Sequence, residues 1–250
     1  MQYGICNLSV ISVRRQADDL SEMTTQLLYG ETFKVLEQRK FWSRIRVSFD
    51  GAEGWVSNIQ YQEIEEAIYQ QLVAKSAAYS TDLVSYISAT DNSLTPIVLG
   101  SNICNAPLMK HVFEGNTIAE SKNKTHFLNT SLLYNNAPFL QGGKTPFGID
   151  AAGLTQMVYK INGHQLGRTA LEQSKQGEAL SFIEECEPGD LAFFDNNEGI
   201  IDHVGIIMPN NYIIHTNGKV RIDRIDHTGI FNSDTRSYSH SLRVIKKIIA

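Results

Sequence analysis

The fold of the C-terminal half of this chain is decided by the stretch KTPFGIDAAGLTQMVYK, residues 144–160. It begins as a Gly-containing loop and continues as an apolar segment, which predicts a helix that ends near Gly163. The first turn of such a helix carries unpaired backbone N–H groups, which favour negative charge and lower the pKa of a thiol placed there. This layout predicts a nucleophile directly after Asp150, but the chain has Ala151 and Ala152 at these positions.

Three segments further along the chain carry polar residues inside apolar runs. They are EPGDLAFF (187–194), DHVGIIM (202–208) and YIIHTNGKVRID (212–223), and they contain His203 and His215. Amide hydrolysis by a nucleophile needs an imidazole to move the proton and a third polar group to orient that imidazole. The order of Asp150, His203 and His215 therefore indicates a nucleophilic hydrolase whose nucleophile is missing.

At these residues the chain resembles the NlpC-type cell-wall peptidases, a papain-like family of cysteine peptidases. In that family the helix opens with Asp-Cys-Ser-Gly, the base lies in a His-Val-Gly-Ile strand, and a third polar residue follows in Ile-His-Ala-Ser-Gly. The resemblance places the lost nucleophile at Ala151, the base at His203 and the third member at His215. The branch similar to dipeptidyl-peptidase VI, which cleaves γ-D-glutamyl-L-diamino-acid bonds, also carries bacterial SH3-like barrels before the catalytic domain.

The resemblance implies a subsite for a free N-terminal L-Ala, and several positions of that subsite are changed. A Tyr of the family is replaced by Phe139, and two Ser residues are replaced by Ala152 and Leu171. An engineered inactive enzyme would lose only the nucleophile at Ala151. Changes at four positions together favour natural divergence of the site.

Two charged residues of the same subsite persist, namely Asp150 and Arg168. The resemblance implies that Asp150 pairs with an ammonium group of the ligand. By a weaker resemblance, Glu22 is a candidate second carboxylate, contributed by a barrel; an ordinary solvated turn residue is the alternative.

No cofactor and no metal ion are expected. Asp195, Asp202, His203 and His215 are candidate zinc ligands by residue type, but strand-borne His without a Cys pair or a second His at helical spacing is weak evidence for a metal. A nucleophile relocated to Cys104 or Cys186 is also disfavoured, because both lie in other segments. The remaining histidines are expected to face solvent or to be hydrogen-bonded polar groups: His111, His126, His164, His227 and His240.

Composition limits the partners and the compartment. The 250 residues are 42% hydrophobic and carry a net charge of −5 without a basic patch, which argues against nucleic acid as a partner. The sequence has no run of 18 apolar residues, so no membrane span is expected, and no secretory signal is expected either. The three scattered cysteines suit free thiols in a reducing compartment, so a cytoplasmic location is expected.

The chain is expected to form an α+β fold, with a papain-like domain preceded by one or two SH3-like barrels. Residues 1–62 alternate in short strands with a turn at Asp50–Gly51, which predicts the first barrel. Residues 63–120 are expected to form a linker helix, over 63–80, and a degenerate second barrel. Residues 121–250 are expected to form the papain-like domain, with helices over 124–137, 153–163 and 169–180 followed by antiparallel strands.

Three functions fit this sequence. The first is a catalytically inactive peptidase-like protein that binds a cell-wall-derived peptide or a protein partner. The second is an active γ-D-glutamyl-L-diamino-acid hydrolase with an unrecognised nucleophile. The third is a structural or interaction module whose barrels carry the function.

Overall fold

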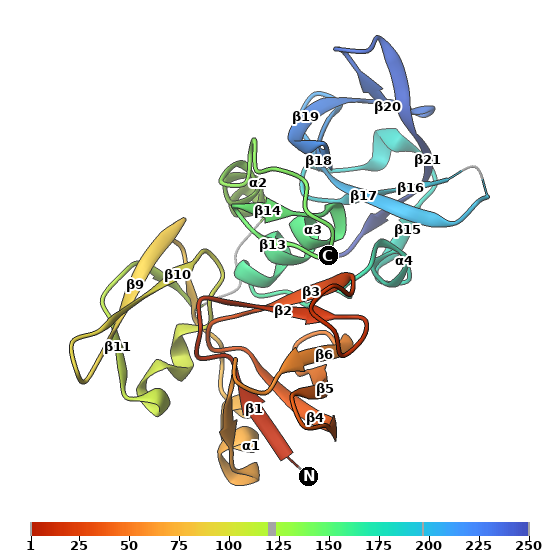
Figure 1. The fold of residues 1–250 in the computed structure, drawn as a ribbon. Coiled ribbons are helices and arrows are strands. Elements are labelled where there is room, and N and C mark those ends of the chain that lie inside the picture. Colours follow the sequence, from red (N-terminus) through yellow and green to blue (C-terminus); the bar gives the residue numbers. More distant parts are fainter. Residues whose placement is uncertain (1, 120–123, 197, 250) are drawn as a thin grey trace. The chain divides into compact units, whose positions relative to one another are not determined.

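The computed structural model describes residues 2–119, 124–196 and 198–249, and the chain divides into two compact units. The first unit contains Met1–Glu120 and Gln141–Thr145, and the second contains Ser121–Leu140 and Pro146–Ala250 (Figure 1). Among the described residues, no helix is both long enough and apolar enough to cross a membrane.

The first unit is built around a seven-stranded antiparallel sheet in the order β3-β2-β6-β5-β4-β1-β7. Strand β5 alternates buried and exposed residues, and its partner β6 follows a tight turn at Gly51, where φ is +75°. The inward side chains form one apolar core, as the predicted SH3-like barrel requires. The strands are β1 Gln2–Ile5, β2 Val10–Arg14, β3 Met23–Leu28, β4 Thr32–Gln38, β5 Trp42–Val47, β6 Glu53–Ser57 and β7 Gln62–Ile64.

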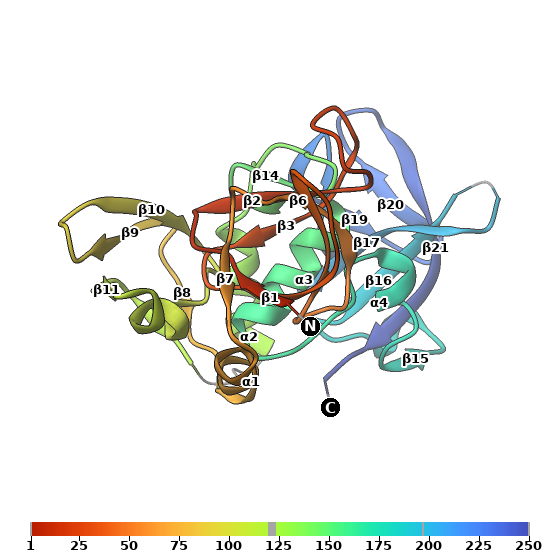
Figure 2. The same ribbon diagram turned by 60° about the horizontal axis from the view of Figure 1, so that its bottom comes forward.

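The rest of the first unit follows the barrel in sequence and shares apolar contacts with it. Ile87 and Ile97 pack in one cluster with Ile5 and Tyr29 of the barrel. Figure 2 shows the three-stranded sheet β10-β9-β11 beside the barrel, and β8 pairs separately with β12. The predicted second barrel domain stays a prediction. The elements are α1 Glu66–Ala74, β8 Tyr79–Ser80, β9 Val84–Ala89, β10 Leu94–Val98, the 3-10 helix η1 Ile103–Met109, β11 His111–Phe113, β12 Thr117–Ile118 and β13 Lys144–Thr145.

The second unit combines helices with a seven-stranded antiparallel sheet, which confirms the α+β class. The sheet has the order β15-β21-β16-β17-β18-β19-β20, and an additional pairing of β20 with β21 closes six of its strands into a ring. The elements are α2 Lys124–Leu132, β14 Gly148–Ile149, α3 Ala151–Ile161, α4 Ala170–Gln173, β15 Glu178–Leu180, η2 Ile183–Glu185, β16 Leu191–Asp195, β17 Ile201–Met208, β18 Tyr212–Asn217, β19 Lys219–Ile225, β20 Gly229–Asn232 and β21 Ser237–Lys247.

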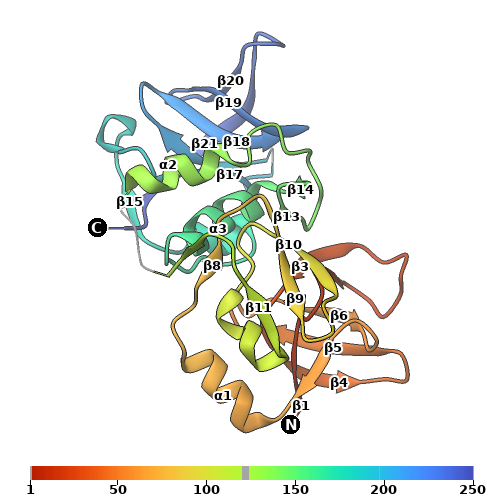
Figure 3. The same ribbon diagram turned by 90° about the vertical axis from the view of Figure 1, so that its left-hand side faces the viewer.

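The closed sheet has its own apolar core, and α3 packs against it. Each of the six ring strands contributes at least one side chain to a single buried cluster, so these side chains define the inner face of the ring; they are Ala192, Phe194, Ile207, Ile213, Ile225, Ile230 and Ile245. Helix α3, buried along its whole length, packs against β17 and β18, and α2 packs against α3 (Figure 3). The two strands on which α3 packs are those that carry His203 and His215.

The structure shortens two of the expected helices of this unit and adds a strand. The helix predicted over 124–137 ends at Leu132. The helix predicted over 169–180 is the single turn of α4, because Gly177 adopts a φ of +68° and residues 178–180 pair with β21. Strand β20 was not predicted from its sequence.

Candidate functional site

Helix α3 begins where the sequence places the nucleophile of the family. Asp150 is its N-cap, and its Oδ1 accepts a hydrogen bond of 2.6 Å from the backbone N–H of Gly153. Ala151 is the first residue of the helix, and both Ala151 and Ala152 are buried. A methyl group therefore occupies the position at which this helix would activate a thiol.

His203 and His215 lie on neighbouring strands and form a hydrogen bond. His203 Nε2 lies 3.0 Å from His215 Nδ1, and His215 Nε2 lies 3.0 Å from Asp223 Oδ2. An ionised carboxylate only accepts, so the hydrogen between His215 and Asp223 belongs to His215 Nε2. When His215 is neutral, its Nδ1 accepts from His203 Nε2–H, which leaves His203 Nδ1 with the lone pair of a general base.

Asp223, at the end of the segment that supplies His215, extends this array beyond what the sequence predicted. It is buried on β19, and Arg221 Nη2 donates a 2.9 Å hydrogen bond to its Oδ1. Burial raises the pKa of Asp223, but the hydrogen bonds from His215 and Arg221 outweigh burial and the pKa is lowered overall. The carboxylate is therefore ionised at neutral pH and able to hold the His215 ring in one tautomer.

A third imidazole joins the site from β21. The ring of His240 stacks on that of His203 at a centroid distance of 3.9 Å and an interplanar angle of 19°. From the sequence, His240 was expected only to face solvent or to be a hydrogen-bonded polar group, so this contact was missed. The ring is partly buried, and its Nδ1 lies 2.9 Å from Ser239 Oγ.

The surroundings keep His203 and His240 uncharged at neutral pH. Burial, followed by the neighbouring rings of His240 and His215, holds the pKa of His203 well below its usual value of 6.5. Burial, and then the nearby His215, lowers the pKa of His240 to about 4. Two stacked neutral rings avoid the repulsion that two imidazolium ions would have.

Acidification is expected to destabilise the fold through these rings. Because their pKa values are lower in the folded state, the unfolded chain binds more protons between about pH 6.5 and pH 4, and stability falls as the pH falls through this window. For His240 alone we expect a loss of about 1–2 kcal/mol between pH 6.5 and 4.5, allowing for its partial exposure.

Urea unfolding at several pH values in the presence of EDTA measures this loss. His240→Phe keeps a ring on His203 and removes a titrating group, so its pH slope should be shallower than that of the wild type. His227→Phe, at an exposed position of the same unit, is the matched control and should keep the wild-type slope. An unchanged slope in His240→Phe would contradict the assignment.

Asp150 and Arg168, which were predicted separately as site residues, form a buried ion pair. Arg168 Nη1 lies 3.0 Å from Asp150 Oδ1, and Arg168 Nη2 lies 2.7 Å from Oδ2. The two side chains are 10% and 6% exposed for Asp150 and Arg168, respectively. Asp150 therefore already has a cationic partner, and a ligand ammonium group would have to share the carboxylate with Arg168.

The structure gives the positions of the remaining predicted site residues, but it does not test their roles. Phe139 and Leu171 are both exposed side chains of the second unit, with Leu171 on α4. Glu22 lies in the first unit, where it forms an exposed ion pair of 3.0 Å with Arg15. Their ligand-binding roles, and the approach of the Ala151 methyl group to the His203 imidazole, stay predictions.

Cys186 gains no support as a relocated nucleophile. Cys186 is a free, partly buried thiol of the second unit. Burial, and then the nearby Asp190, raises the pKa of Cys186. Less thiolate is therefore present at neutral pH, which is opposite to the activation that cysteine catalysis needs.

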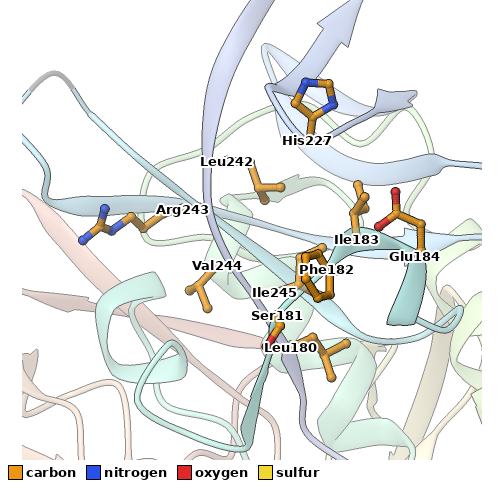
Figure 4. A pocket seen from close by; sticks show the side chains of 10 residues that line it. All are labelled: Leu180, Ser181, Phe182, Ile183, Glu184, His227, Leu242, Arg243, Val244 and Ile245. Atoms are coloured by element: carbon orange, nitrogen blue, oxygen red, sulfur yellow. The ribbon is translucent and has the colours of Figure 1, made fainter.

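A separate cavity of about 360 Å³ lies between the η2 region and β21 of the second unit. Figure 4 shows its labelled side chains, among them Phe182 next to η2, Ile183 at the start of η2 and Leu242 on β21. Neither His203 nor His215 lines it. This cavity is therefore not the site predicted from the sequence.

Two segments match known protein families. Residues 136–238 match the NlpC/P60 family, and residues 13–59 match the bacterial dipeptidyl-peptidase SH3 domain.

Curated relatives agree with these matches. A gamma-D-glutamyl-L-lysine dipeptidyl-peptidase of Bacillus subtilis is 24% identical over 212 residues, which cover 77% of this chain and 71% of that protein. The dipeptidyl-peptidase 6 of Lysinibacillus sphaericus is 23% identical over 247 residues, which cover 82% of this chain and 85% of that protein. A probable endopeptidase p60 of Listeria seeligeri is 39% identical over 90 residues, or 35% of this chain and 17% of that protein.

Solved structures share the fold. An NlpC/P60 family protein from Bacillus cereus superposes with a TM-score of 0.82 at 15% identity, covering 99% of this chain and 100% of that chain. An NlpC/P60 endopeptidase from Photobacterium damselae gives a TM-score of 0.66 at 15% identity, and the match covers 97% of this chain and 70% of that chain. The chain therefore combines an NlpC/P60-family domain with a bacterial dipeptidyl-peptidase SH3 domain, and it is related to the γ-D-glutamyl-L-lysine dipeptidyl-peptidases.

Proposed function

We propose that this chain is a catalytically inactive member of the NlpC/P60 family that binds peptides derived from the bacterial cell wall. The observation that carries the proposal is Ala151, a methyl-bearing residue at the first position of α3, in a domain that otherwise keeps the hydrogen-bonded array of His203, His215 and Asp223.

The chemistry of the family explains why this one position matters most. Cysteine peptidases form a covalent acyl intermediate on sulfur, and the imidazole only moves protons for that step. An Ala side chain cannot form the intermediate, however well His203 is oriented. Removing the nucleophile of such a catalytic unit costs about a factor of 10⁶ in rate.

The relatives suggest the class of ligand. Their names describe peptidases that act on γ-D-glutamyl-L-lysine peptides, so L-Ala-γ-D-Glu-L-Lys is the natural probe. The buried pair of Asp150 and Arg168 keeps a carboxylate at the start of α3. In this proposal the α-ammonium group of the peptide joins that pair and is held by Asp150.

Calorimetry with L-Ala-γ-D-Glu-L-Lys tests the binding. Asp150→Asn preserves the size of the side chain and a carbonyl oxygen for the helix cap, but removes the charge that would pair with the ammonium group. Because an ion pair in a partly desolvated pocket contributes a few kcal/mol, we expect binding to weaken by about one to two orders of magnitude.

The matched control is the same peptide with an acetylated N-terminus, which should bind the wild type and Asp150→Asn equally weakly. No detectable binding of the free tripeptide at millimolar concentration would overturn the peptide-binding proposal. An interaction module with a protein partner would then be the surviving function.

We also propose a cytoplasmic location. Cys6, Cys104 and Cys186 form no disulfide bond, which suits a cytoplasmic protein that meets imported or recycled cell-wall peptides. The active-hydrolase alternative is tested by the rate measurement argued in the Discussion.

A further inference from the structure

Three imidazoles converge on the inner face of the closed sheet, and the lost peptidase chemistry does not need all of them. His203, His215 and His240 each offer one ring nitrogen, and these three atoms lie within 4.8 Å of one another. His203 and His215 are buried and His240 is partly buried. Such a convergence on three different strands gathers donors of the type that late first-row divalent metal ions prefer.

The outer contacts of the rings resemble those of metal-binding histidines. His215 donates Nε2–H to the buried carboxylate of Asp223, so its Nδ1 is the nitrogen that points to the other rings. His240 uses its Nδ1 toward Ser239 Oγ, which leaves its Nε2 as the candidate donor atom. In metal sites, a carboxylate or hydroxyl on the remote ring nitrogen fixes the tautomer and raises the basicity of the ligating nitrogen.

The separation of the nitrogens is compatible with an ion after small rotations of the rings. His203 Nε2 and His215 Nδ1 are 3.0 Å apart, whereas two nitrogens bound to one tetrahedral zinc ion at about 2.0–2.1 Å are about 3.3 Å apart. The ion would replace the hydrogen of this hydrogen bond, and that hydrogen would move to His203 Nδ1. His240, the most exposed of the three, would have to leave its stack on His203 to bring its nitrogen closer.

We propose that His203, His215 and His240 together bind one divalent metal ion of the zinc class, with Asp223 orienting His215 from behind. Three protein ligands leave a fourth coordination position for water or a ligand. This site is independent of the proposed peptide binding, because it uses neither Asp150 nor Arg168.

The metal itself is the probe. Tag-free protein is stripped with EDTA, dialysed, and titrated with Zn²⁺ by calorimetry and with Co²⁺ by visible absorption. We expect one ion per chain with a Kd in the micromolar range or tighter, and a Co²⁺ absorption band between about 500 and 650 nm with the intensity of tetrahedral coordination.

The variants identify the ligands. His240→Phe keeps a ring on His203 and removes one donor, and it should weaken Zn²⁺ binding at least tenfold and abolish the tetrahedral band. His215→Gln should do the same, and His227→Phe, an exposed histidine of the same unit, should bind Zn²⁺ as the wild type does. If His215→Gln fails to fold, His240→Phe still decides the question.

Two results would overturn the site. One is the absence of Zn²⁺ binding to the wild type at about 100 µM, and the other is a Kd that His240→Phe leaves unchanged. The tripeptide titration of the same EDTA-treated protein reports on the proposed function separately, so failure of one proposal does not imply failure of the other.

Discussion

No L-Ala-γ-D-Glu is expected to be released when the purified protein is incubated with L-Ala-γ-D-Glu-L-Lys. The physical reason is the methyl group of Ala151 at the first position of α3, where the family resemblance implies the thiolate of a cysteine peptidase. We expect a rate about 10⁶-fold below that of an intact cysteine peptidase, which is at the background of a chromatographic assay over hours. A measurable rate that disappears in His203→Ala would show that another nucleophile serves the site.

The reverse substitution separates the nucleophile from the subsite. Ala151→Cys restores a thiol at the N-terminus of α3, in the same unit as the His203 array. We expect it to react with iodoacetamide but to recover little peptidase activity, because Phe139, Ala152 and Leu171 also differ from the residues that the family resemblance implies. Full activity in Ala151→Cys would show that the altered subsite positions do not matter.

The local parts of the site could be predicted from the sequence. The start of α3 is set by a capping Asp150 and an apolar run, and the strands of His203 and His215 are continuous apolar segments. Both signals lie within a few residues along the chain. The α+β class and the SH3-like barrel followed from the same local patterns.

The parts that were missed depend on strand register. Phe194 on β16 pairs with His203 on one side and with Leu242 on the other, and His240 lies two residues from Leu242, on the same face. The closure of the sheet through β20 and β21 is equally non-local. A side chain's neighbours across three strands do not appear in the sequence order, so the stack of His240 on His203 could not be foreseen.

The pairing of Asp150 with Arg168 was missed for a related reason. Both residues were recognised separately as subsite positions, and 18 residues separate them. The structure shows that the same carboxylate caps α3 and neutralises a buried guanidinium group. Asp150, which is proposed to bind the ligand, is therefore also expected to stabilise the domain.

Replacing Asp150 with Ala is expected to lower the free energy of unfolding by about 4–6 kcal/mol. Removal of one partner of a buried ion pair costs about 3–5 kcal/mol, because the remaining charge is left unpaired, and the loss of an N-cap adds about 1 kcal/mol. Urea denaturation followed by circular dichroism measures the change. A loss below about 1 kcal/mol would mean that the pair does not stabilise the domain.

The double variant Asp150→Ala/Arg168→Met distinguishes the ion pair from the helix cap. Arg168→Met removes the buried charge and keeps an unbranched side chain of similar length, so in the Asp150→Ala background it should recover part of the lost stability. The two single losses should therefore sum to more than the loss in the double variant, by about 1–3 kcal/mol for two residues in contact. Strictly additive losses would attribute the effect of Asp150→Ala to the cap of α3, and Asp150 would then be available to a peptide ammonium group without competition from Arg168.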